Sequence, residues 1–167
     1  LLFGCGDGDN PPPSNSSPAG VPSSVAGSEI TINPVIKFSA NGSTFEYDNT
    51  LATGSNFPLG THQGAFVFSA NESTGQVFLT LTAAPAWPDG ALSLELSGFL
   101  DVDGSGLIDT FSYTASYGAV KTVGSGEFSG GKPANPNADA SSIPDVSGAP
   151  TKDEWNKYIV GKNMVWY

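Results

Sequence analysis

Apolar and polar residues alternate over much of the chain between residues 29 and 123, in short segments separated by turn residues. A period of two is typical of strands that bury one face and expose the other. The clearest case is the segment 91–115, in which two alternating stretches flank an acidic, glycine-rich turn. The apolar positions of this segment are Leu92, Leu94, Leu96, Phe111 and Tyr113. The pattern predicts a β-hairpin.

Two further hairpins are predicted upstream of this segment. The first turns at Asn41-Gly42, a dipeptide that favours type I′ turns. The second joins alternating residues from Phe66 onward to those of 77–83, with a predicted loop at 48–63 before it. Its turn, residues 68–74, is similar in sequence to residues 38–44. We attribute this similarity to shared turn chemistry rather than to duplication, since two copies are too few for a repeat architecture.

Short alternating segments with frequent turns define the expected fold class. The chain holds 21 glycines and 13 prolines in 167 residues, so turns are frequent and one core of ordinary size is expected. We predict an all-β protein: an antiparallel β-sandwich or barrel of hairpins, with one short C-terminal helix. The β domain is placed at residues 29–123.

The two flanks of this domain lack the alternating pattern. Residues 1–28 contain few large apolar side chains after the first three, so we predict a signal-peptide remnant and a flexible tether. Residues 124–150 are rich in glycine, proline, asparagine and serine and are predicted to be a linker or long loop. In residues 151–167 a capping box precedes a predicted helix and strand. This strand would begin a further β unit, or pair with the first sheet or with another molecule.

The acidic turn carries oxygen-bearing residues at alternate positions. In EF-hand loops the calcium ligands occupy positions 1, 3, 5, 7 (through the carbonyl), 9 and 12, with glycine at 6. The first five of these places are taken here by Asp101, Asp103, Ser105, Leu107 and Asp109, and the sixth position by Gly106. The turn therefore resembles EF-hand and related calcium loops over nine positions, which implies a weak Ca²⁺ site. Ser112 at the twelfth position departs from the pattern. The alternative is a plain hairpin turn with solvated carboxylates.

The first five residues, Leu-Leu-Phe-Gly-Cys, have the form of an apolar signal segment that ends in a small residue and a cysteine. They resemble the lipobox of bacterial lipoproteins, in which the signal peptidase cuts before the cysteine and its thiol receives a lipid. The resemblance implies a lipid on Cys5 and a location in the bacterial cell envelope, at the outer membrane, in the periplasm or on the surface. The missing initiator Met fits a truncated signal peptide. A free thiol in a disordered tail is the alternative.

Charge and composition exclude several other functions. Acidic residues outnumber basic ones by 16 to 6, and the net charge of −10 repels phosphate backbones, so nucleic acid is not an expected partner. The single histidine, His62, and the single cysteine give no support for a histidine-rich metal site or a Cys–His pair. The spacing of the glutamates selects no glycosidase pair. We therefore predict a protein that is not an enzyme.

Two function classes remain after these exclusions. The first is a non-catalytic, lipid-anchored envelope or cell-surface module for binding or assembly, stabilised by calcium and joined to a protein partner. The second is a carbohydrate-binding or carbohydrate-processing β-sandwich. Its support is Trp87, which the proline-bracketed segment 84–90 would hold on a loop, where the ring could stack on a sugar. Covering the open end of the core is the alternative role for Trp87.

Overall fold

The structure, a computed structural model, describes residues 17–51 and 55–138. In these residues every regular element is a strand, which confirms the all-β prediction. The strands are β1 (Ser17–Pro18), β2 (Ser28–Thr31), β3 (Val35–Phe38), β4 (Thr44–Asn49), β5 (Gly60–Asn71), β6 (Gln76–Ala83), β7 (Leu92–Asp101), β8 (Thr110–Tyr117) and β9 (Val120–Gly130). The predicted helix and strand of residues 151–167 lie outside the described residues. Within the described ranges, no helix has the length and apolar character needed to cross a membrane.

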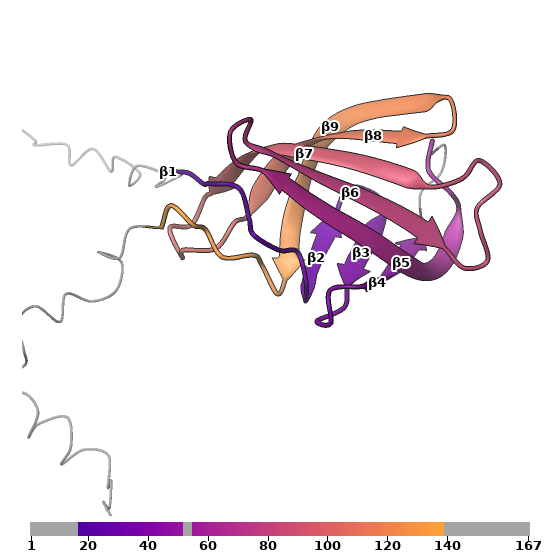
Figure 1. Cartoon of the computed structure of the whole chain (residues 1–167), viewed down its shortest axis with the longest axis horizontal. Helices are drawn as coiled ribbons and strands as arrows, with labels where there is room; N and C mark the ends of the chain where they lie inside the picture. Colours follow the sequence, from indigo (N-terminus) through magenta and orange to yellow (C-terminus); the bar gives the residue numbers. More distant parts are fainter. Residues whose placement is uncertain (1–16, 52–54, 139–167) are drawn as a thin grey trace, which may run out of the picture. The chain divides into compact units, whose positions relative to one another are not determined.

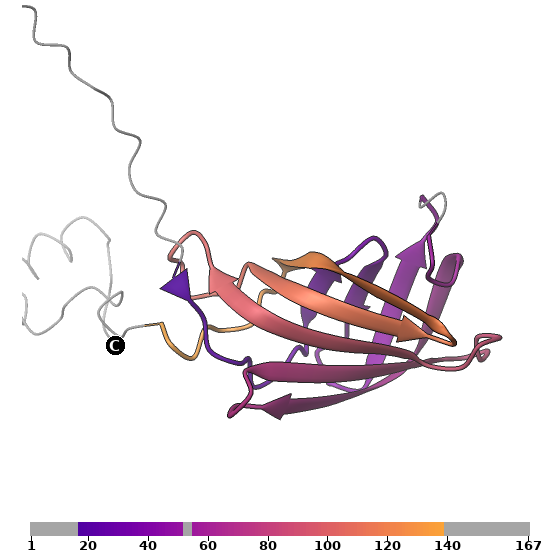
Figure 2. The same ribbon diagram turned by 90° about the horizontal axis from the view of Figure 1, so that it is seen from above.

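Strands β2 to β9 form a closed antiparallel barrel in which each strand pairs with its neighbours in sequence. The barrel closes where β2 pairs with β9, from Ser28↔Gly130 to Thr31↔Glu127. Figure 1 and Figure 2 show this barrel in two views at right angles. Of the two predicted architectures the structure has the barrel. Closure pairs these strands on both sides and leaves the sheet without long free edges.

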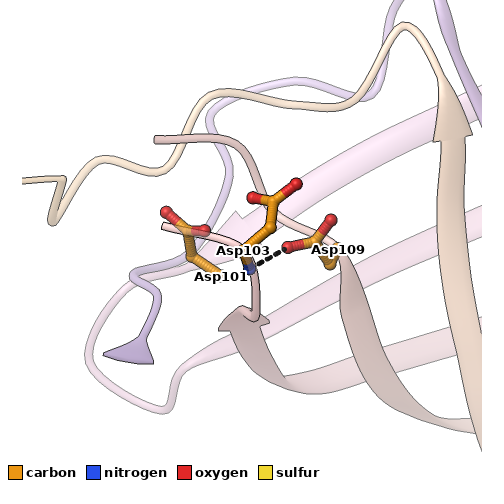
Figure 3. A group of neighbouring side chains, drawn as sticks. All are labelled: Asp101, Asp103 and Asp109. Carbon is orange, nitrogen blue, oxygen red and sulfur yellow. Dashed lines mark hydrogen bonds between the residues drawn. The ribbon is translucent and has the colours of Figure 1, made fainter. Parts of the chain in front are cut away.

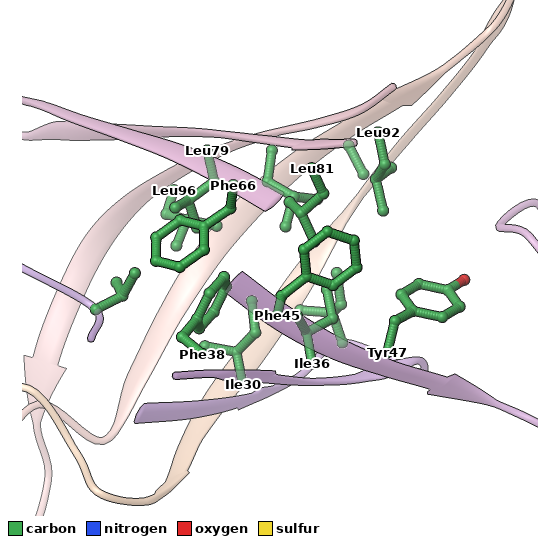
Figure 4. Packing of buried hydrophobic residues seen from close by; sticks show 14 of the residues in the cluster. Ile30, Ile36, Phe38, Phe45, Tyr47, Phe66, Leu79, Leu81, Leu92 and Leu96 are labelled. Atoms are coloured by element: carbon green, nitrogen blue, oxygen red, sulfur yellow. The ribbon is translucent and has the colours of Figure 1, made fainter. Parts of the chain in front are cut away.

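The inside of the barrel is packed with apolar side chains. Along β6, every second residue is buried, as the alternating sequence predicts. In Figure 4, Phe38 and Phe66 approach each other across the interior, and their ring centroids lie 4.8 Å apart in an edge-on arrangement. The other side chains labelled there are Ile30, Ile36, Phe45, Tyr47, Leu79, Leu81, Leu92 and Leu96. The interior of a barrel of about eight strands has the width that side chains can fill. The side chains named above fill the interior of this barrel.

The three predicted hairpins are confirmed as β3–β4, β5–β6 and β7–β8. The first two turns share one device. Asn41 Oδ1 accepts the backbone N–H of Ser43 at 3.0 Å, and Asn71 Oδ1 accepts that of Ser73 at 3.2 Å. Asparagine favours such turns because its side chain bonds the backbone two residues on. The predicted loop 48–63 is shorter than expected, since β4 continues to Asn49 and β5 begins at Gly60.

The prediction of a linker at 124–150 is wrong in its first part, because β9 runs to Gly130 and closes the barrel. The glycines of β9 give it a low-complexity sequence, but one of them has a packing role. A Cβ on Gly126 would lie 2.5 Å from the Phe111 ring and 2.6 Å from Cγ2 of Ile32. Gly126 thus makes room for side chains from neighbouring strands. Periodicity did not reveal this strand, because its two buried positions are Gly126 and Phe128, and the first of them has no side chain.

The predicted tether, residues 1–28, also extends too far, because residues 17–28 belong to the folded unit. Strand β1 pairs with the end of β7 through Ser17↔Asp101 and Pro18↔Leu100. Farther along, Ala19 donates its N–H to the carbonyl of Phe99 at 2.8 Å, and Val25 is 1% exposed in the core. Backbone hydrogen bonds attach much of this segment to the barrel. The prediction was wrong here because it relied on the shortage of large apolar residues. The remainder, residues 1–16 with Cys5, lies outside the described residues.

Candidate metal centre

The acidic turn, residues 101–109, connects β7 to β8 at one end of the barrel. Asp101 is the last residue of β7 and is 3% exposed. Gly104 and Gly106 have φ angles of 68° and 78°, in the left-handed region that favours glycine. Calcium loops need a glycine at the sixth position for a sharp turn. Gly106 occupies that position here and has the expected left-handed conformation.

Three carboxylates of this turn converge. Asp101, Asp103 and Asp109 each offer one oxygen, and these oxygens lie within 4.8 Å of one another. Figure 3 shows the three side chains gathered around the turn. Asp101 is buried, Asp109 is partly buried and Asp103 is exposed. A cluster of this kind could hold a metal ion, since carboxylate oxygens are the ligands of hard cations.

Backbone N–H groups orient the three carboxylates. Asp101 Oδ1 accepts the N–H of Ser105 at 3.1 Å, and its Oδ2 accepts that of Gly106 at 2.9 Å. The N–H of Ser105 also donates to Asp103 Oδ1 at 2.9 Å. Asp109 Oδ2 accepts the N–H of Val102 at 2.7 Å. The burial and bonding of Asp101 do not fit a plain turn with solvated carboxylates.

The other two predicted ligands, Ser105 and Leu107, take part in the turn through their backbone atoms. Ser105 donates its N–H to the cluster, as described above, and Leu107 forms an isolated antiparallel bridge with Ala134. The predicted ligation by the Ser105 hydroxyl and the Leu107 carbonyl stays a prediction.

Lys132, in the segment after β9, places a positive charge in the cluster. Its Nζ forms a hydrogen-bonded ion pair with Asp109 Oδ1 and lies 3.6 Å from Asp103 Oδ2. The Lys132 side chain is 24% exposed and that of Asp109 is 13% exposed, so this pair is largely shielded from water. Sequence analysis missed Lys132 because it lies in the predicted linker. The available signal was a lone basic residue in a segment dominated by glycine, proline and asparagine.

Hydrogen bonds and charges within the cluster shift the pKa values of Asp103, Asp109 and Lys132. Bonds from the Ser105 hydroxyl and N–H, followed by the charge of Lys132, lower the pKa of Asp103. Burial alone would raise the pKa of Asp109, but bonds from Lys132 and from the N–H groups of Val102 and Asp103 outweigh it, so this pKa is lowered. The bond to Asp109 raises the pKa of Lys132. All three shifts favour the charged forms.

Residues 131–137, here called the clasp, hold the acidic turn from one side. The N–H of Ile108 donates to the carbonyl of Pro133, and the N–H of Asn135 donates to that of Gly106, both at 2.9 Å. The Asn135 side chain is buried; its Nδ2 donates to Asp101 Oδ2 at 3.4 Å, and its Oδ1 accepts the N–H of Gly20 at 3.3 Å. The centre is therefore assembled from three separate parts of the chain.

Trp87 lies in the β6–β7 connection, at the end of β7 opposite the acidic turn. It is 5% exposed, and its ring centroid lies 5.2 Å from that of Tyr47, 5.4 Å from that of His62 and 6.2 Å from that of Tyr117. The indole thus covers this end of the core, which is the alternative that the sequence left open. In this structure it has no exposed face on which a sugar ring could stack.

Fold and site together define a class: a closed antiparallel barrel, formed by β2 to β9 of the described residues, with a packed interior and an acidic centre beside its β7–β8 turn. No protein-family model matches this chain, and no curated protein or solved structure matches it significantly.

Proposed function

We propose that this protein is a non-catalytic binding or assembly module of the bacterial cell envelope, anchored by a lipid on Cys5 and stabilised by calcium at its acidic turn. The observation that carries the proposal is the convergence of Asp101, Asp103 and Asp109, with oxygens within 4.8 Å of one another. The lipid anchor rests on the lipobox-like first five residues.

Calcium suits the chemistry of the centre. Ca²⁺ takes six to eight oxygen ligands in flexible geometry, so the three carboxylates need completion by the Ser105 hydroxyl, the Leu107 carbonyl or water. The missing twelfth-position carboxylate favours weak binding, with a Kd on the order of 10⁻⁴–10⁻³ M, which matches extracellular calcium modules. Because the centre includes Asn135 and lies beside Gly20, an ion there would stabilise the place where both flanks join the barrel.

Because side chains fill the interior of the barrel, a partner would have to bind the outer surface. The outer face of β3 to β5 contributes to a groove of about 620 Å³, lined in part by Lys37, Glu46, Asp48, Thr61 and Gln63. Its charged and amide side chains suit a polar partner, either a protein or a glycan. This groove is also the remaining support for the carbohydrate-binding alternative. Glycan-array binding that is lost in Asp48→Asn would favour that alternative, whereas co-purification with a protein partner and no glycan binding would favour assembly.

The calcium proposal is tested by thermal unfolding in Ca²⁺ and in chelator. A ligand that binds only the native state stabilises it by RT ln(1 + [L]/Kd), which is about 1.4 kcal/mol at a tenfold excess over Kd. For a domain of this size, Tm should then rise by roughly 3–6 °C. We expect the rise in the full chain and in Asp48→Asn, an outer-face control, but not in Asp101→Asn. A rise that persists in Asp101→Asn would contradict the proposal.

The anchor is tested separately by mass spectrometry of the amino-terminal peptide after expression in a bacterium with an intact lipoprotein pathway. We expect an acylated Cys5 and recovery of the protein in the membrane fraction, with both lost in Cys5→Ala. Cys5 recovered as an unmodified thiol would contradict the anchor.

A further inference from the structure

We propose that Lys132 and a divalent cation are alternative occupants of the Asp101–Asp103–Asp109 cluster, so that binding of the cation displaces the Lys132 ammonium. This inference rests on the proposed function, because it specifies how the proposed calcium centre is regulated. Without the cation, Lys132 balances part of the cluster's negative charge and holds the clasp against the turn.

The first support is the bonding of the carboxylate oxygens. Backbone N–H groups donate to both oxygens of Asp101, to Oδ1 of Asp103 and to Oδ2 of Asp109. The two oxygens that remain are Asp103 Oδ2 and Asp109 Oδ1, and Lys132 Nζ lies against both. A carboxylate oxygen that accepts an N–H can still bind a cation, as Asp101 would in this centre, but the two oxygens without an N–H donor are the least engaged. A cation held by all three carboxylates would draw on these two first. Lys132 and the cation therefore compete for the same atoms.

The second support is electrostatic. Three carboxylates within 4.8 Å bring three negative charges together, and Lys132 balances one of them. A divalent cation beside the retained ammonium would put like charges a few ångströms apart, where repulsion is strong in a site partly shielded from water. Exchange avoids this repulsion and leaves the cluster with less net charge than Lys132 does. It also lowers the apparent affinity, since the cation must first break an ion pair.

The third support is that Lys132 can leave while the clasp stays in place. Its side chain is 24% exposed and consists of a flexible four-carbon stem with a strongly hydrated end. The clasp keeps its other attachments, from Pro133 to Ile108 and from Asn135 to Gly106, because neither involves the ammonium. Exchange thus releases a positive charge to solvent beside the clasp without opening the barrel.

The test is calorimetric titration of Ca²⁺ into the full chain and three variants. Lys132→Met removes the charge and keeps a long apolar stem, whereas Lys132→Arg keeps the charge. Lys121→Met removes the same charge from an exposed position on β9 and controls for the change in net charge. We expect Lys132→Met to bind Ca²⁺ about tenfold tighter than the unsubstituted chain or more, with little change in the other two. Binding by Lys132→Met that is no tighter than that of Lys121→Met overturns the exchange.

The outcomes separate this inference from the proposed function. If the unsubstituted chain and Lys132→Met bind Ca²⁺ equally, the calcium proposal stands and the exchange fails. If only Lys132→Met binds, Lys132 excludes Ca²⁺ from the cluster and is not displaced by it, so both the exchange and the calcium proposal fail. If neither binds, both fail.

Where circular dichroism shows that Lys132→Met does not fold, a labelling measurement on the unsubstituted chain replaces it. Lysines are acetylated with an amine-reactive reagent, with and without Ca²⁺, and quantified by mass spectrometry. We expect several-fold faster acetylation of Lys132 in Ca²⁺ and no change at Lys121. An unchanged rate at Lys132 then overturns the exchange.

Discussion

The barrel interior is shielded from water and the acidic centre only partly so, and different forces hold the two regions. The interior consists of apolar side chains such as Leu81 and Ile30, both 0% exposed, whose stabilisation depends on buried area. The centre consists of carboxylates, N–H groups and Lys132, whose stabilisation depends on protonation and on competing ions. The two regions should therefore respond to different changes: the interior to lost apolar volume, and the centre to pH and to added ions.

The first prediction concerns the interior and carries the largest effect. Leu81→Ala should lower the free energy of unfolding by about 2–5 kcal/mol, because it removes buried methyl groups and leaves a cavity. The loss should be the same in Ca²⁺ and in chelator, as measured by urea denaturation. Thr80→Ala, its exposed neighbour on β6, should change the stability by less than about 0.5 kcal/mol. A loss at Leu81 that depends on calcium would break the distinction between the two regions.

The second prediction tests the tight contact under β9. Gly126→Val should cost about 1–3 kcal/mol, since its Cβ would lie 2.5 Å from the Phe111 ring and the strands would have to shift. Ser125→Val adds the same side chain at an exposed neighbouring position and should be tolerated. Both variants are compared by urea denaturation. Equal stabilities would mean that Gly126 has no packing role.

The third prediction moves to the acidic centre. Asn135→Ala should cost about 1–3 kcal/mol, because it leaves the Gly20 N–H without its acceptor and removes a donor from Asp101. The control is Asn56→Ala, an exposed asparagine whose side chain makes a 3.5 Å contact with Thr122. Chemical denaturation measures both variants. A loss at Asn135 no greater than that at Asn56 would show that the clasp contributes little.

The fourth prediction concerns pH and carries the smallest effect. The pKa values of Asp103 and Asp109 are lowered in the folded chain, so their contribution is present above the unfolded value, about 4, and is lost as the pH falls through the folded values. The raised pKa of Lys132 acts oppositely, and its contribution is lost only as the pH rises above about 10.5.

Stability measured from pH 6 down to pH 2 should therefore fall less steeply in Asp109→Asn than in the unsubstituted chain. Leu81→Ala should keep the unsubstituted slope, because it changes only the apolar interior. Parallel curves for Asp109→Asn and the unsubstituted chain would argue against the lowered pKa of Asp109.

Local sequence patterns determined a large part of this protein. The alternation of apolar residues in β6 and β7 predicted their buried faces, because side chains point to opposite sides of a strand. Turn residues such as Asn41 predicted where the chain reverses. The aspartates of residues 101–109 could be recognised as one cluster because they lie within nine residues.

The tertiary structure decided the closure of the barrel and the composition of the centre. Glu29 and Ser129, 100 residues apart in sequence, are paired by closure, and Lys132 reaches Asp109 from 23 residues away. A period of two reports which face of a strand is buried, but it does not specify the distant strand that pairs with it. The packing role of Gly126 and the bonds of Asn135 therefore exist only once closure has brought those segments together.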